Sequence, residues 1–285
     1  MAIPGFVSVI LFVYVPLYGL QLAFKRFRLI DGIWASPWIG LHHFRILLSS
    51  ASFLQVLRNT IEISIGRLIF TFPAPILLAL LLNELRNRTF KRTVQSILYL
   101  PHFLSWVIMA GIIFNVLSLR TGVVNNVLAE IGLPRIMFLG NPRAFRPLIY
   151  GSAIWKSAGW GTIIYLAAIA GIDPQLYESA IIDGANRLRR ALHITIPSMA
   201  YAIVILLILN IGNMLDAGFD QIFNLINPAT QSVGDIIDTY VYRLGIAEGR
   251  YDFTTAVGLF KNVFNCLLLF GANRLVKVFG HEGFI

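Results

Sequence analysis

Long apolar runs constrain the fold of this chain more than any other feature of its sequence. A helix needs about 20 mostly apolar residues to cross a bilayer, because each residue adds about 1.5 Å to its length. A mean hydropathy of +0.73 and a hydrophobic content of 57% are also typical of a chain that lies largely in lipid. We therefore predict a single all-α integral membrane domain over residues 1–285. The six expected transmembrane helices lie at about 4–24, 58–83, 97–118, 147–170, 199–219 and 256–276.

The orientation of the chain follows from the connections between these spans. An even number of spans places both chain ends on one side of the membrane, together with connections 84–96 and 171–198. Lys and Arg are similarly frequent on the two sides, so their totals do not decide the orientation. The basic cluster at 86–92 and the acidic excess in 220–255 favour a cytoplasmic position for both termini.

Two of the expected spans contain residues that change helix geometry. Pro73 and Pro75 lie midway through the second span, where each removes a backbone donor and favours a kink. The fourth span contains small residues that allow a neighbouring backbone to come close. These are Gly151, Ser157, Ala158, Gly159 and Gly161.

A charged segment, residues 177–197, separates the fourth and fifth apolar runs. Asp173 and Pro174 are typical of a helix start, and they predict a short helix to about residue 182. Gly184 then allows a sharp turn. A second short helix is expected from about 185 to 194, before Pro197 introduces the fifth span. Two short helices joined by a glycine turn would form a rigid shape at the membrane surface that could insert into a partner.

This segment resembles the signature of the permease subunits of bacterial binding-protein-dependent ABC importers. The family signature is Glu-Ala-Ala, three residues, Gly, nine residues and then Ile-x-Leu-Pro. The present chain has Glu-Ser-Ala at 178–180, Gly184 in register, and Ile-Thr-Ile-Pro at 194–197. Ser179 and Ile196 depart from the family pattern, and both are conservative in size.

Further stretches are similar to the carbohydrate-importing branch of this family, and together they cover most of the chain. They are Pro16-Leu17-Tyr18, Asn59-Thr60, residues 79–84 and residues 90–101. The resemblance implies the type I importer permease fold, with a coupling helix between the fourth and fifth spans. It also implies import of a saccharide, most specifically an oligosaccharide or polysaccharide.

The resemblance assigns roles within the coupling loop, 171–198. In the family this loop docks into a groove of an ATP-hydrolysing subunit, which would make it cytoplasmic. Glu178 would then meet a basic group of that subunit and fix the register of docking. Arg187, Arg189 and Arg190 are expected to be solvated, or to face lipid head groups or an acidic surface of the ATPase. The residues expected to couple to the ATPase are Glu178, Ser179, Ala180, Asp183, Gly184, Ala185 and Pro197.

The resemblance also implies the partners. These are a second, different permease subunit, two ATP-binding subunits that hold ATP and Mg, and an external solute-binding protein. The binding protein would dock on the loops 25–57, 119–146 and 220–255 of a multi-pass protein of the bacterial inner membrane. We expect no cofactor, metal, catalytic residue or nucleic-acid partner for this chain, and no enzyme activity of its own, because it lacks a Gly-rich Gly-Lys-Ser/Thr phosphate loop.

Polar residues inside the spans are the candidates for a translocation path. Aromatic faces beside hydrogen-bonding groups suit a sugar ring, and polar residues that share a helix face suggest a wet cavity. Interhelical hydrogen bonds are the alternative role for such residues, and we expect Glu62 and Arg67 to form a structural pair of this kind. The candidates are Trp155, Lys156, Trp160, Tyr165, Asn210, Asn213, Asp216, Lys261 and Asn262, with Asn265 on the face of Asn262.

The class of saccharide is less constrained. The loops 25–57 and 119–146 are strongly basic, which would attract an anionic glycan or complement an acidic binding protein. The branch includes importers of uronate-containing glycans such as alginate. A permease for another small solute, or a secondary transporter, would share the spans, but a secondary transporter would not need the signature at 178–197. A membrane enzyme is disfavoured because the histidines do not cluster with carboxylates.

Overall fold

The apolar runs all form helices in the structure, a computed structural model that describes residues 3–278. Three helices in this range are long and apolar enough to cross a membrane, namely Ile3–Phe24, Ala51–Asn83 and Tyr251–Arg274. The fourth expected span lies in α10 (Pro142–Ala170), which is 29 residues long but is not among these three. The third and fifth expected spans each lie in a pair of helices with a bend between them. The all-helical fold is therefore confirmed, while two of the spans are not single rods.

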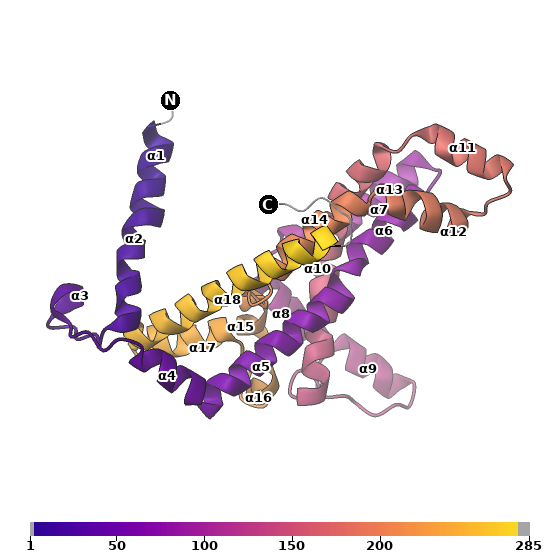
Figure 1. Cartoon of the computed structure of the whole chain (residues 1–285). Coiled ribbons are helices and arrows are strands. Elements are labelled where there is room, and N and C mark those ends of the chain that lie inside the picture. The colour runs from indigo at the N-terminus through magenta and orange to yellow at the C-terminus, as the bar shows by residue number, and fades with distance from the viewer. Residues whose placement is uncertain (1–2, 279–285) are drawn as a thin grey trace.

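The first span projects away from the rest of the described chain (Figure 1). It is one run of mixed helical turns with no buried side chain before its last turn. Only that last part packs on the C-terminal helix. The run consists of α1 (Ile3–Val9), η1 (Ile10–Tyr14), α2 (Val15–Leu17) and η2 (Tyr18–Phe24), and α3 (Gly32–Ala35) and α4 (His42–Ser49) follow it.

The second span continues through its two prolines. It consists of α5 (Ala51–Gly66), the π-helical turn η3 (Arg67–Thr71) and α6 (Pro73–Asn83). Ser50 caps its start by accepting a hydrogen bond from the backbone N–H of Phe53, 3.3 Å away. Just before Pro73, the N–H of Phe72 bonds the carbonyl of Arg67 at 3.1 Å, five residues back. The wider turn places an irregularity midway along this helix.

The third span is sharply bent. α7 (Arg88–Tyr99) and η4 (Leu100–Phe103) end at the bend, and α8 (Trp106–Leu117) leaves it at 105°. Ser105 starts α8 by accepting a hydrogen bond from the N–H of Ile108 at 3.3 Å. The expected span over 97–118 is therefore a bent pair of helices, because a new helix begins in the middle of that run.

The small residues of α10 bring its backbone close to two neighbours. A side chain added at Gly159 would collide with the backbone carbonyl of Leu98 in α7. One added at Gly161 would meet Pro75 of α6 at 2.9 Å. Close approach of this kind is how membrane helices gain packing energy without a hydrophobic driving force.

The fifth span is shorter than expected. It follows α11 (Pro174–Ile182), α12 (Arg187–Arg190), η5 (Ala191–Thr195) and α13 (Ile196–Ser198), and the chain bends by 64° before α14 (Ala200–Gly212). α14 ends at Gly212 rather than at 219, and a turn leads into the next helix. The prediction that Asp216 lies on this helix was wrong.

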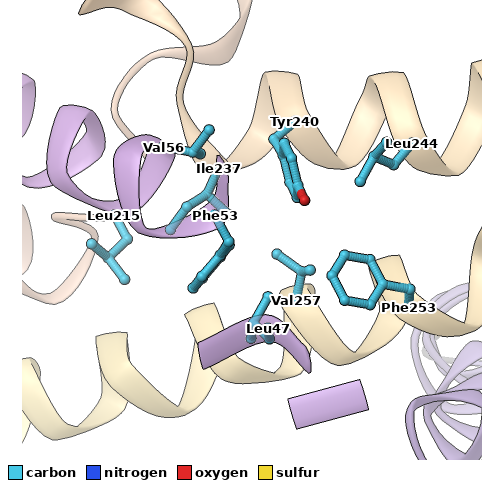
Figure 2. Close-up of a cluster of buried hydrophobic side chains, with 9 residues drawn as sticks. All are labelled: Leu47, Phe53, Val56, Leu215, Ile237, Tyr240, Leu244, Phe253 and Val257. Carbon is cyan, nitrogen blue, oxygen red and sulfur yellow. The ribbon is translucent and has the colours of Figure 1, made fainter. Parts of the chain in front are cut away.

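Short helices link the spans on the side opposite α11. They are α9 (Val123–Glu130), α15 (Phe219–Leu225), α16 (Gln231–Gly234), α17 (Ile237–Val241) and η6 (Tyr242–Ala247), and the long α18 (Tyr251–Val278) completes the described chain. Figure 2 shows one of the apolar clusters, in which Phe53 of α5 gathers with Tyr240 of α17 and with Phe253 and Val257 of α18. Two further clusters join α5 and α8 with α10, and α6 with α10. The hydrophobic core is therefore distributed along the contacts between these helices.

Candidate functional site

The segment between α10 and α14 forms the helix, turn and helix that its sequence predicts. Asp173 caps α11 by accepting a hydrogen bond from the N–H of Gln175 at 2.9 Å. Gly184 has φ +75°, a left-handed conformation that side chains disfavour. The N–H of Ala185 then bonds the carbonyl of Ala180 at 2.8 Å, and the N–H of Gly184 bonds that of Ile181 at 3.0 Å. These two bonds form a Schellman motif, which makes the turn a defined structure.

The outer surface of this segment is apolar and exposed. No side chain of α11 or α12 is buried, and Ile182 is 86% exposed. Ile181 and Leu188 are exposed beside it, and the two helices lie at one extreme end of the molecule (Figure 1). Exposed apolar side chains that gather at a rigid tip are typical of a surface that binds another protein.

The base of the segment is held to the membrane helices by polar contacts. The hydroxyls of Tyr177 and Thr195 lie 3.0 Å apart and link α11 to η5. Nε of Arg187 pairs with Oε2 of Glu84, at the end of the second span, at 3.5 Å. Arg187 is therefore more than the solvated charge expected, although an exposed pair adds little stability. The side chain of Arg189 is exposed as predicted.

A cavity of about 450 Å³ lies between the second, fourth and fifth spans. Its walls come from α5, η3 and α6 on one side, from α10 on another, and from α14 and the turn after it. Its size is within the usual range for small-molecule sites. Its polar lining residues are Ser64, Arg67, Thr71, Ser157, Tyr165, Asn210, Asn213 and Asp216.

The cavity brings together four of the predicted path residues: Tyr165, Asn210, Asn213 and Asp216. The side-chain amides of the two asparagines donate to the carbonyls of Leu206 and Leu209 on their own helix, at 2.8 and 3.1 Å. Asp216 reaches the cavity from the turn beyond α14. It therefore does not share a helix face with Asn210 and Asn213. That these residues contact the substrate stays a prediction.

Lys156, Trp155 and Trp160 lie outside this cavity. Nζ of Lys156 donates to the carbonyls of His102, at 2.9 Å, and of Leu104, at the bend of the third span. The ring of Trp160 stacks on His102 with centroids 4.7 Å apart, and Trp155 is exposed. The bend leaves backbone carbonyls without helical partners, and Lys156 satisfies them. That Lys156 and the aromatic residues beside it contact a sugar stays a prediction.

The remaining charged candidates pair within the protein. Nζ of Lys261 lies 2.6 Å from Oδ1 of Asp238 and also pairs with Asp216, while Asn262 is exposed. Its neighbour Asn265 accepts a hydrogen bond from the N–H of Leu215 at 3.1 Å. These contacts join α18 to α17 and to the turn after α14.

The expected pair of Glu62 and Arg67 is absent from the described residues. Glu62 pairs with Arg58 at 2.7 Å and with Arg146 of α10, whereas Arg67 donates to Oε1 of Gln221. The two side chains are five residues apart, which points them in different directions around the helix. Ser64, Arg67 and Thr71, at spacings of three and four, form a polar face that the sequence analysis missed and that helical spacing alone would have revealed.

The fold and the coupling segment define a class of protein. Residues 71–219 match the family described as "Binding-protein-dependent transport system inner membrane component", and the chain belongs to this family. It is 45% identical to Protein LplB of Bacillus subtilis (strain 168) over 281 residues, which cover 99% of this chain and 88% of that protein. The family predicted from the signature is therefore confirmed.

Two further relatives name their substrates. The chain is 46% identical over 283 residues to the polygalacturonan/rhamnogalacturonan transport system permease protein YteP of Bacillus subtilis (strain 168), and the match covers 99% of this chain and 88% of that one. It also resembles a chain of a bacterial alginate ABC transporter solved in complex with an alginate pentasaccharide-bound periplasmic protein. That likeness has a TM-score of 0.92 and 42% identity, and it covers 99% of this chain and 94% of the other.

Proposed function

We propose that this chain is a transmembrane permease subunit of an ATP-driven importer, and that it moves an acidic oligosaccharide or polysaccharide from an external binding protein into the cytoplasm. The relatives support a saccharide, because the names of two of them specify polygalacturonan, rhamnogalacturonan or alginate. All of these glycans contain uronate residues, and the basic outer loops of this chain would favour such a substrate electrostatically. The protein would lie in the bacterial inner membrane as a multi-pass subunit with both termini cytoplasmic.

The observation that carries the coupling role is the rigid tip formed by α11, Gly184 and α12. Its exposed apolar side chains need a partner, and its two helices are braced to the membrane helices, so a force on the tip is transmitted to the spans. ATP binding would draw two ATPase subunits together, move this tip and shift the spans between inward-facing and outward-facing states. The residues proposed to contact the ATPase are Glu178, Ser179, Ala180, Asp183, Gly184, Ala185 and Pro197.

The proposed importer also needs ATPase subunits, a second permease and a binding protein. ATP and Mg would be bound and hydrolysed by the two partner subunits, because the sequence has no phosphate-binding loop. A second homologous permease would complete the pore, and the exposed first span offers an apolar surface for it. The external binding protein would dock on the loops opposite α11.

Co-purification tests this proposal directly. A tagged chain expressed with its partner subunits should retain both the second permease and the ATPase subunits, and the reconstituted complex should take up an acidic oligosaccharide only with ATP and the binding protein present. Isolation of the chain without any ATPase subunit, or uptake that continues without ATP, would contradict it.

Gly184 allows a sharper test of the coupling role. Gly184→Leu forces a side chain into a left-handed conformation, which costs roughly 1–2 kcal/mol, and distorts the tip. We expect retention of the ATPase subunits to fall by about tenfold, equivalent to ~1.4 kcal/mol, with the membrane fold intact.

A matched control is Gly249→Leu. Gly249 also has a positive φ, +72°, and open space around its Cα, but it lies at the opposite end of the chain's spans. This variant should retain the ATPase subunits. The measurement is the ratio of ATPase subunits to permease after affinity purification. If the two variants retain the ATPase subunits equally, Gly184 has no role in docking.

A further inference from the structure

Arg67 differs from the other cations within the spans. It lies midway along the helix Ala51–Asn83, where a charged side chain is expensive. Lys156 has three backbone carbonyls, Lys261 has two carboxylates, and Arg146 has Glu62. Within residues 3–278, Arg67 takes part in no ion pair, and its hydrogen bond goes to the neutral amide of Gln221. Its charge therefore has no counter-charge in the described part of the chain.

Two polar atoms beside this charge have no partner. Nε of Arg67 and Oγ1 of Thr71 are buried, and neither makes a hydrogen bond to the described residues. Both side chains belong to η3 and line the 450 Å³ cavity. A buried donor left without an acceptor costs free energy, and π-helical turns are frequent at functional sites. The two unpaired atoms therefore single out this part of the cavity wall as a candidate site for a polar ligand.

The guanidinium of Arg67 is held in place from behind. Nε2 of Gln221 donates to the carbonyl of Ile149 at 2.7 Å and to Oγ of Ser152 at 2.8 Å, so that its Oε1 faces Arg67. Gly218 lies against the guanidinium, and a side chain at that position would collide with it. These contacts orient the arginine without neutralising it, which is the arrangement expected of a recognition group.

The charge balance of the cavity gives the sign of the ligand. Asp216 is the carboxylate in its lining, and that carboxylate pairs with Lys261. Ser64, Ser157, Asn210 and Asn213 add uncharged groups that hydrogen-bond to hydroxyls. A ligand with a carboxylate on a hydroxylated ring would satisfy both kinds of group, since Arg binds carboxylates with charge-assisted hydrogen bonds.

We infer that Arg67, together with Thr71, binds the carboxylate of a uronate residue as the saccharide crosses the membrane, and that Arg67 makes this permease selective for acidic over neutral saccharides. The inference rests on the proposed function, and it names the residue that recognises the negative charge of the substrate. Arg67 contacts the substrate, while Gln221 and Gly218 position the arginine.

The test uses the complete importer reconstituted in vesicles with its binding protein. The probes are an oligogalacturonate and its carboxyl-reduced, neutral counterpart. Arg67→Met should lower ATP-driven uptake of the acidic probe by about tenfold or more, and Arg67→Lys should give an intermediate rate because it keeps the charge but loses the planar fork. ATP turnover stimulated by the loaded binding protein should stay within about twofold. The acidic-to-neutral uptake ratio should fall by a similar factor to the acidic uptake, because the binding protein's own preference is the same for every variant.

Arg58→Met is the matched control, because Arg58 lies on the same span but is exposed, pairs with Glu62 and is outside the cavity. Its uptake should stay within about twofold of the unmodified importer. If Arg67→Met transports the acidic probe as fast as this control, or if uptake and ATP turnover fall together, Arg67 has no role in recognition. If the unmodified importer takes up neither probe, the proposed function itself fails.

Discussion

Gly159 shows how a single residue sets the distance between two membrane helices. It faces the backbone of α7, where a side chain would collide with the carbonyl of Leu98. Gly151, two turns earlier on α10, has open space around it. The two glycines lie on one helix and differ only in what they face, so they separate the packing role of glycine from its effect on helix propensity.

We expect Gly159→Ala to destabilise the protein and Gly151→Ala to leave it unchanged or slightly more stable. The first substitution forces α10 and α7 apart, and such overpacking costs about 1–3 kcal/mol. The second adds helix propensity, which contributes up to ~1 kcal/mol. Thermal unfolding of the purified chain in detergent measures both, and equal unfolding temperatures for the two variants would show that the α7–α10 contact does not limit stability.

At the scale of elements, the bend of the third span depends on a side chain from another helix. η4 ends at the bend, where its last carbonyls have no N–H partners within the helix. Lys156 of α10 donates to the carbonyls of Pro101, His102 and Leu104 around this bend and is only 9% exposed. The bend and the fourth span therefore stabilise each other.

Lys156→Met should weaken this contact and destabilise the protein by about 1.5–3 kcal/mol, the usual contribution of hydrogen bonds to a charged group. Lys91→Met is the control, because the side chain of Lys91 makes no hydrogen bond or ion pair with the described residues. Thermal unfolding of the purified chain checks the difference. A Lys156→Met variant with unchanged stability and reduced uptake would instead restore the substrate role that its sequence context suggested.

At the scale of the whole molecule, the first span is separate from the packed helices. Its side chains before Tyr18 are all exposed within this chain, and it joins the remainder through η2, which packs on α18 and α4. The other spans share apolar clusters that draw on segments far apart in the sequence (Figure 2). The stability of the isolated chain should therefore depend on the clusters and not on the first span.

Two phenylalanines test this separation. Phe53→Ala opens a cavity where the side chain is 0% exposed, and we expect a loss of about 3 kcal/mol or more. Phe12→Ala removes a side chain that is 77% exposed, so the isolated chain should unfold at the same temperature as before. A comparable loss for Phe12→Ala would mean that the first span packs against the core.

The sequence by itself determined the features that depend on neighbouring residues. The length of each apolar run predicted a membrane helix, because the need to satisfy backbone groups in lipid leaves few alternatives. The cap at Asp173, the start at Pro174 and the turn at Gly184 were correct, since each depends on conformational preferences within a few residues. The spacing of the signature around Gly184 also identified the family.

The tertiary structure decided which polar groups meet. Helical spacing placed Asn210 and Asn213 correctly, but Asp216 lies beyond the end of α14, and Lys156 contacts carbonyls more than 50 residues away in the chain. The partner of Arg67 comes from α15, and only the folded chain shows that no carboxylate within residues 3–278 pairs with it. These contacts depend on where separate helices bend and cross, and local preferences of the chain carry no information about a partner on another helix.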